Sequence, residues 1–103
     1  MFYVKVHEAS GEVLVAGCDR EILGSVLTEG DLEVRVNERF YGGEESDEEN
    51  FLRRIEDATI VNIMGNRIVE LAIKKNLVSE KNVRKIGGVK HAQIVWIPNR
   101  KTG

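Results

Sequence analysis

The order in which two hydrophobic periods occur along the chain is the feature that most constrains its fold. Near the amino end, Phe2, Val4 and Val6 alternate with polar residues, which is the period of a β-strand. Phe51 and Ile55 belong instead to a stripe with the spacing of an amphipathic helix. Because the pattern passes from strand to helix and back, it predicts an α+β domain with a mixed sheet of about four to five strands and two to three helices mainly on one face.

Local turn and cap signals divide the chain into predicted elements. The pair Ser10-Gly11 predicts a hairpin turn between the first two strands. Asp19 is a predicted N-cap for a short helical turn that reaches Val26, and Ser46 with Glu49 forms a predicted capping box. The predicted strands are 2–7, 12–16, 32–36 with 39–41 as an extension, 59–64 and 91–97, and the other predicted helices are 46–58, 66–75 and 79–86.

The length of 103 residues fits one domain, which we place at 1–98, followed by a polar tail at 99–103. Pro98 is predicted to end the last strand. The longest apolar runs, at 13–16 and 94–97, are far shorter than the ~20 residues that cross a bilayer, so we expect no membrane partner. No secretory signal is visible, and a lone Cys18 cannot form an internal disulfide, which together predict a cytoplasmic protein.

The net charge of −2 conceals two halves of opposite sign. Residues 1–57 contain six Lys/Arg and fifteen Asp/Glu, for a balance of −9, and residues 58–103 contain nine and two, for a balance of +7. A dipolar chain of this kind can present one charged face to a partner. It can also neutralise itself if the acidic and basic segments pack together, and this is the favoured interpretation.

Three residues could supply a nucleophile, its orienting acid and its base: Cys18, Asp19 and His91. A thiolate needs a nearby His or a helix N-terminus to lower its pKa, and Cys18 stands just before a predicted helical turn. A free Cys is more often a small buried apolar group, so packing is the favoured interpretation.

Metal and cofactor sites are not expected. The acidic run at 44–49 lacks the spaced pattern of a calcium loop, and a helix start that matches the helix dipole explains it. One Cys and two His residues cannot build a structural zinc site.

The basic, glycine-containing segment near the carboxyl end is the strongest binding signal. Gly87 and Gly88 would let backbone amides approach an anion, and His91 and Gln93 can form hydrogen bonds with phosphate, sugar or base edges. An exposed Trp96 could stack on a base, although an isolated Trp in a strand is usually part of the core. The candidate nucleic-acid-binding residues are Lys81, Arg84, Lys85, Gly87, Gly88, Lys90, His91 and Gln93.

Several short motifs resemble a small archaeal family known as domain of unknown function four-two-four. They are Cys18-Asp19 with Ile22-Leu23-Gly24, Phe40-Tyr41-Gly42-Gly43-Glu44, Asn62-Ile63-Met64-Gly65, and the stretch from Ile86 to Gln93. The family has Pro before the His, where this chain has Lys90, so the rigidity of that loop does not carry over. The resemblance implies an archaeal α+β protein encoded among translation genes, without an established activity. Its matching positions are Cys18, Asp19, Tyr41, Glu44, Asn62, Gly65, His91 and Gln93.

Three functions remain open at this point. The first is a non-enzymatic binding module for RNA or a ribosome-associated component, favoured by the basic segment. The second is a protein-interaction or homo-oligomerisation domain in which Trp96 or Tyr41 anchors a partner. The third, and least favoured, is a small enzyme that uses Cys18 with His91.

Overall fold

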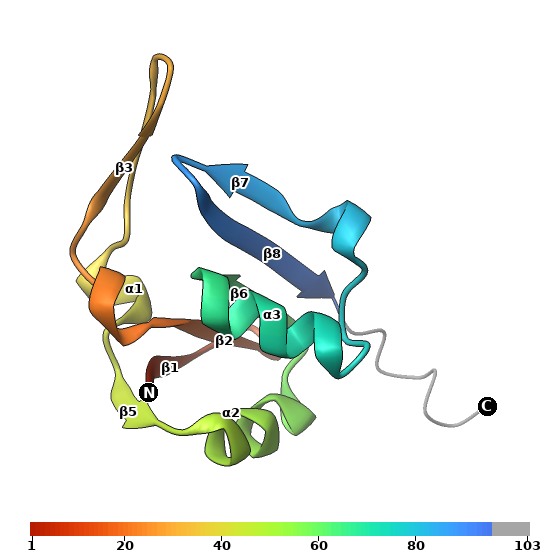
Figure 1. The fold of residues 1–103 in the computed structure, drawn as a ribbon. Coiled ribbons are helices and arrows are strands. Elements are labelled where there is room, and N and C mark those ends of the chain that lie inside the picture. The colour runs from red at the N-terminus through yellow and green to blue at the C-terminus, as the bar shows by residue number, and fades with distance from the viewer. Residues whose placement is uncertain (96–103) are drawn as a thin grey trace.

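The computed structural model describes residues 1–95 and shows a single α+β domain. Its main sheet is mixed and has six strands in the order β5-β1-β2-β6-β8-β7, and a second sheet consists of β3 and β4 (Figure 1). The strands are β1 (Phe2–Ala9), β2 (Glu12–Asp19), β3 (Val26–Glu29), β4 (Leu32–Arg35), β5 (Glu44–Ser46), β6 (Ile60–Met64), β7 (Arg84–Ile86) and β8 (Val89–Val95). The helices are α1 (Glu38–Tyr41), α2 (Glu48–Arg54) and α3 (Asn66–Lys74).

The predicted amino-terminal hairpin is confirmed. Ser10 and Gly11 both have positive φ angles, 53° and 81°, which match the right-handed twist of two paired strands. β2 extends three residues beyond its predicted end because its second half is buried and pairs in parallel with β6. Gly17 allows close packing there, since a Cβ atom would lie only 2.8 Å from Cδ1 of Ile68 in α3 and that side chain would have to shift.

The helices α2 and α3 pack on one face of the sheet, which we call the covered face. Phe2 and Phe51 meet there edge to face, with ring centroids 6.0 Å apart, and Ile68 is fully buried. Each large apolar side chain buried in this layer contributes about 1.5–3 kcal/mol. The buried members of this core are Phe2, Val4, Val15, Phe51, Ile55, Ala58, Val61, Ile63, Ile68, Val69, Leu71, Ala72, Ala92 and Ile94.

The opposite face, which we call the open face, is only partly covered, by α1 and the β3–β4 hairpin. That hairpin extends away from α2 and passes the turn between β7 and β8, where Thr28 of β3 lies beside Gly87 (Figure 1). A smaller core lies beneath it, made by Ala16, Cys18, Leu27, Val36, Tyr41 and Met64. Side chains alternate along each strand, so odd positions of β1 and even positions of β2 and β6 belong to the open face.

Of two further predicted elements, one is confirmed in part and one is wrong. The helical turn after Asp19 is confirmed only as a 3-10 turn at Arg20–Ile22, and Val26 lies in β3, opposite Arg35. Residues 39–41 do not extend a strand, because Asn37 accepts hydrogen bonds from the amides of Arg39 and Phe40 and starts helix α1.

The start of α2 differs by one residue from the capping box predicted at Ser46. Asp47 is the N-cap, and its carboxylate accepts a hydrogen bond from the amide of Asn50 at 2.8 Å. Ser46 instead ends β5 opposite Phe2 and is buried. An acidic N-cap provides the same hydrogen bond and also suits the helix dipole.

The helix predicted at 79–86 is also wrong. A 3-10 turn at Glu80–Asn82 precedes β7, which pairs with β8 through a turn at Gly87 and Gly88. Both glycines have positive φ, 57° and 81°, so they close a hairpin rather than end a helix. The additional strands β5 and β7, each of three residues, raise the sheet to six strands.

Some predictions concern residues outside the described range. The end of the last strand at 96–97, the stop at Pro98, the tail at 99–103 and the roles considered for Trp96 all lie there. Within residues 1–95, the longest helix has nine residues, and no helix could span a membrane.

Candidate functional site

Three polar side chains from distant parts of the chain meet on the open face. The Tyr41 hydroxyl donates a hydrogen bond to Oδ1 of Asn62 at 2.5 Å. Nε2 of His91 lies 3.3 Å from the same oxygen. Because that oxygen only accepts, this contact requires a proton on Nε2 and leaves Nδ1 of His91 as an acceptor. We call these three side chains the polar trio.

Each member of the polar trio is held by a different element. Tyr41 ends α1, and its ring packs edge to face against Phe40 with centroids 4.8 Å apart. Asn62 lies at the centre of β6, and His91 lies on the adjacent strand β8, opposite Met64. Phe40 in turn stacks on His7 of β1, with centroids 5.1 Å apart, and accepts a hydrogen bond at its carbonyl oxygen from that ring.

Burial keeps the polar trio uncharged near neutral pH. Burial, with a smaller contribution from Cys18, raises the pKa of Tyr41, so its hydroxyl remains a donor. Burial lowers the pKa of His91, and the positive charge of Arg84 lowers it further. At neutral pH the site therefore offers uncharged hydrogen-bonding groups.

Asn62 retains hydrogen-bonding capacity. Its carbonyl oxygen accepts from Tyr41 and His91, and its amide nitrogen has no acceptor among residues 1–95. The neighbouring Gln93 is directly opposite Asn62 in the register and is exposed. The side chains of Asn62 and Gln93 are therefore cross-strand neighbours on the open face, with their Cβ atoms about 5 Å apart.

Cys18 and Asp19 are not brought together with His91 as a catalytic site. Cys18 has 0% exposure, and burial followed by the charge of Asp19 raises the pKa of its thiol to about 12. Strand β6 separates Cys18 from His91, which corresponds to about 9–10 Å between their backbones. A protonated, enclosed thiol this far from the imidazole does not support nucleophilic catalysis.

Asp19 has a structural function that the sequence did not predict. Its two carboxylate oxygens accept hydrogen bonds from the amides of Arg67 and Ile68, each at 2.9 Å, and so cap α3. It makes no side-chain cap for the turn that follows it. Gly65 has a φ of 133°, and a Cβ atom there would lie 2.4 Å from Cγ of Asp19. The lack of a side chain at Gly65 therefore leaves room for the Asp19 carboxylate that caps α3, which gives both motif positions a structural reason.

The predicted nucleic-acid-binding residues divide between the two faces. Arg84 lies opposite His91 on the open face, together with Gln93, whereas Lys85 and Lys90 lie opposite each other on the covered face. Lys90 is paired with Glu70 of α3. Lys81 is exposed in the turn before β7. These candidate residues therefore do not form one continuous exposed face.

The turn at Gly87 and Gly88 makes contacts with the β3–β4 hairpin. The amide of Gly87 donates to the carboxylate of Glu29 at 2.8 Å, and the backbone oxygen of Thr28 lies 2.6 Å from where a Cβ atom would be. This contact fastens the β3–β4 hairpin to the turn between β7 and β8. The Gly87 amide is therefore not available for an anion in this structure.

Within residues 1–95, the ion pairs lie mostly inside one half of the chain rather than between the acidic and basic halves. Among the described ion pairs, Arg67 with Glu21 joins the two halves, whereas the others lie within one half. Glu44, one of the motif positions, pairs with Arg54 beside α2. Within residues 1–95, no cluster of three metal-binding side chains occurs.

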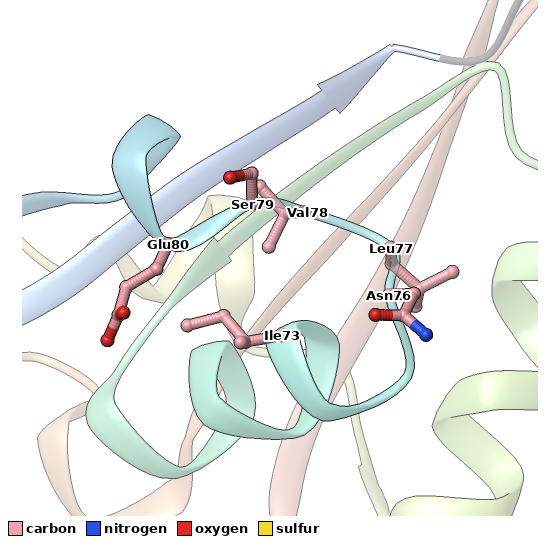
Figure 2. A pocket seen from close by; sticks show the side chains of 6 residues that line it. All are labelled: Ile73, Asn76, Leu77, Val78, Ser79 and Glu80. Carbon is pink, nitrogen blue, oxygen red and sulfur yellow. The ribbon is translucent and has the colours of Figure 1, made fainter.

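A shallow cavity of about 400 Å³ lies at the end of α3, separate from the polar trio. Figure 2 shows Ile73 on the helix, with the other lining residues on the segment that leaves it. Its lining combines Ile73, Leu77 and Val78 with Asn76, Ser79 and Glu80. None of the candidate residues from the sequence borders it.

The fold and the open face define a small α+β domain with a neutral polar site on one side of its sheet. The family model for the protein of unknown function DUF424 matches residues 7–97, and the chain belongs to this family. A crystal structure of an uncharacterized conserved protein from Methanopyrus kandleri matches with a TM-score of 0.72 and 24% identity, over 90% of this chain and 89% of that one. This likeness shows the shared fold. No curated protein matches the sequence.

The motifs identified the positions of the polar trio without indicating that they touch. Tyr41, Asn62, His91 and Gln93 all belong to the motif positions of the family resemblance. Alternation within the strands could have placed Asn62 and His91 on one face, but their register depends on long-range pairing. Sequence analysis missed the stack of His7 on Phe40, because no local pattern joins residues 33 positions apart.

Proposed function

We propose that this protein is a non-enzymatic binding module for RNA or a ribosome-associated component, and that the open face of its sheet is the contact surface. The observation that carries the proposal is the arrangement of Lys5 and Arg84 on either side of the polar trio. Arg84 is opposite His91, and Lys5 lies two strands from Asn62 in the same row of the sheet. Cations beside neutral hydrogen-bonding groups suit a ligand that combines phosphates with bases.

The positions of the acidic side chains on the open face also support RNA binding. Glu45 is at one edge, paired with Arg20, and Glu12 is at a corner, where it accepts a hydrogen bond from Thr59. Neither lies in the row that holds Lys5 and Asn62. The row that holds Lys5 and Asn62 therefore contains no carboxylate, and the hairpin carboxylate Glu29 lies away from this row, at the turn between β7 and β8, where it accepts a hydrogen bond from the Gly87 amide.

A second function, a protein-interaction or oligomerisation domain, is favoured by one observation. Val95 is 59% exposed and lies in the same row of the open face as the half-buried Leu14 and Ile60. An apolar strip beside a polar site is typical of protein contacts. Sedimentation equilibrium distinguishes the two functions, because only the second predicts a stable dimer without RNA.

The test of RNA binding is its dependence on salt and on two cations. We expect the purified protein to bind total RNA or ribosomal subunits at ~50 mM salt and to lose much of this affinity at ~200 mM, since phosphate contacts release counterions. The double variant Lys5→Glu, Arg84→Glu should bind far more weakly. The matched control Lys74→Glu, Lys75→Glu makes the same charge change at exposed positions at the end of α3.

The control variant separates local contacts from overall charge. Equal losses in the two double variants would show that net charge alone matters and would contradict an interface on the open face. The absence of binding at ~50 mM salt would contradict the RNA-binding function itself. Retention in the control with loss in the Lys5 and Arg84 variant is the result that supports it.

A further inference from the structure

The orientation of the Asn62 amide is fixed by its neighbours. Its Oδ1 accepts hydrogen bonds from Tyr41 at 2.5 Å and from His91 at 3.3 Å. Reversal of the amide would place its nitrogen 2.5 Å from the Tyr41 hydroxyl oxygen, which is shorter than the roughly 2.7–3.2 Å of an N–H···O hydrogen bond, so this short contact selects the amide oxygen. Asn62 therefore presents its two N–H donors, and no acceptor, to whatever lies against the open face.

These donors have no acceptor among residues 1–95 although Asn62 is partly buried. Because Asn62 is half-buried on the open face, these donors face solvent rather than another protein group, and an acceptor on a bound ligand could pair with them. Gln93 stands directly across from Asn62, exposed, and can donate or accept. Two adjacent amides of this kind match the paired hydrogen-bonding atoms along the edge of a nucleobase.

We propose that Asn62 and Gln93 form a recognition site for one unpaired base of single-stranded RNA. The inference rests on the proposed RNA-binding function and adds the atoms that distinguish one base from another. Asn62 requires an acceptor atom on the base. Gln93 can donate to, or accept from, the neighbouring atom on the edge of the base. Arg84, one strand beyond His91, binds an adjacent phosphate.

A base suits this site better than a phosphate group does. Phosphate is recognised by cations and backbone amides, and the polar trio is uncharged, with the pKa of His91 lowered by burial and by Arg84. Neutral amides instead contribute to selectivity, because a wrong base leaves their donors without partners. The cations beside the site supply affinity that does not depend on sequence.

Tyr41 is a positioning residue in this arrangement. It touches Asn62 through its hydroxyl, and its ring belongs to the smaller core. Tyr41→Phe keeps the ring and removes the hydrogen bond that selects the amide orientation. The Asn62 amide can then present either its oxygen or its nitrogen, so selectivity between bases should fall while phosphate contacts persist.

The decisive variant is Asn62→Asp, which keeps the acceptor oxygen for Tyr41 and replaces the two donors by a second acceptor. The probes are labelled RNAs of twelve uridines, twelve cytidines or twelve adenosines at ~50 mM salt, with affinity read by fluorescence anisotropy. The control Val95→Asp adds the same charge to the same face at a residue that is 59% exposed. The side-chain amide signals of Asn62, assigned by their loss in Asn62→Asp, are followed by NMR.

We expect the wild type to distinguish the three RNAs and Asn62→Asp to change their affinity ratios by about threefold to tenfold, the value of one hydrogen bond. Val95→Asp should weaken all three equally, and Tyr41→Phe should reduce the ratios with little change in mean affinity. RNA should also shift the Asn62 amide signals.

Two results would overturn the inference while RNA binding through Lys5 and Arg84 stands. One is wild-type affinity that is equal for all three RNAs. The other is a set of ratios that Asn62→Asp and Val95→Asp alter identically, with unmoved Asn62 amide signals. Failure of the wild type to bind any of the three RNAs, or total RNA, would instead contradict the proposed function together with the inference.

Discussion

The two faces of the main sheet are formed by the same strands but differ in the kind of side chain that they hold. On the covered face, Phe2, Phe51 and Ile68 are almost wholly buried and contact one another or their neighbours through apolar atoms. On the open face, Asn62 and His91 occupy central strand positions with half-buried polar groups. Since a sheet needs only one packed face for stability, the second face is free to carry hydrogen-bonding groups.

The largest effect expected from this comparison concerns Cys18, which lies on the open-face side but beneath the β3–β4 hairpin. With no exposure and a thiol pKa raised to about 12, it should react with a thiol reagent only when the protein unfolds. We expect labelling at pH 8 to be slower than in urea by about a thousandfold or more, as for groups protected by global stability. Rapid labelling of the folded protein would revive the cysteine-enzyme hypothesis.

The next effect compares the packing of the two faces directly. Phe51→Ala removes a fully buried ring from the covered face and should lower the free energy of unfolding by about 3–5 kcal/mol. Leu14→Ala acts at a half-buried position of the open face and should cost far less. Urea denaturation of both variants measures the difference. Similar losses would mean that the open face is packed as tightly as the covered one.

A smaller loss is expected at the Asp19 cap of α3 on the covered face. Asp19→Ala leaves the amides of Arg67 and Ile68 without their acceptors and should cost about 2–3 kcal/mol. Asp47→Ala removes the exposed cap of α2 and should cost about 1 kcal/mol. Thermal or urea unfolding of the pair gives the comparison, and an Asp19 loss no larger than that of Asp47 would contradict the importance of its burial.

The sequence predicted those parts of the fold that depend on local signals. The first hairpin, the strand at 59–64 and the helix that begins after Gly65 are confirmed, since turn residues, apolar alternation and helical periodicity act over a few residues. The segment at 79–86 failed because the pairing of β7 with β8 outweighs its helix-start signal. Tertiary pairing commonly overrides such weak propensities.

The candidate site was harder to predict than the fold. The sequence indicated His91 and Gln93 but grouped them with Lys85 and Lys90, which the alternation along β7 and β8 places on the other face. A strand period of two divides any continuous basic segment in this way. The partner of His91 is Asn62, 29 residues away, and only the register between β6 and β8 brings them together.

The smallest expected effect on the free energy of unfolding comes from the titration of His91. This titration also reports directly on the open face. Burial and then Arg84 lower its pKa in the folded protein, so the unfolded chain binds the proton first as the pH falls. The free energy of unfolding should therefore decrease as the pH falls from the ordinary histidine value of about 6.5 toward the lower folded value, and change no further through this group below it. His91→Gln should remove this dependence.

Arg84→Gln isolates the electrostatic part of the shift. It leaves the burial of His91 in place and removes the cation across the strand pair, so the pKa of His91 should rise part of the way toward its ordinary value. NMR titration of the imidazole measures this, with Lys85→Gln on the opposite face of β7 as the control. If both variants moved the pKa of His91 equally, Arg84 and the polar trio would not share one face, and the open face would lose the cation on which its proposed RNA contact depends.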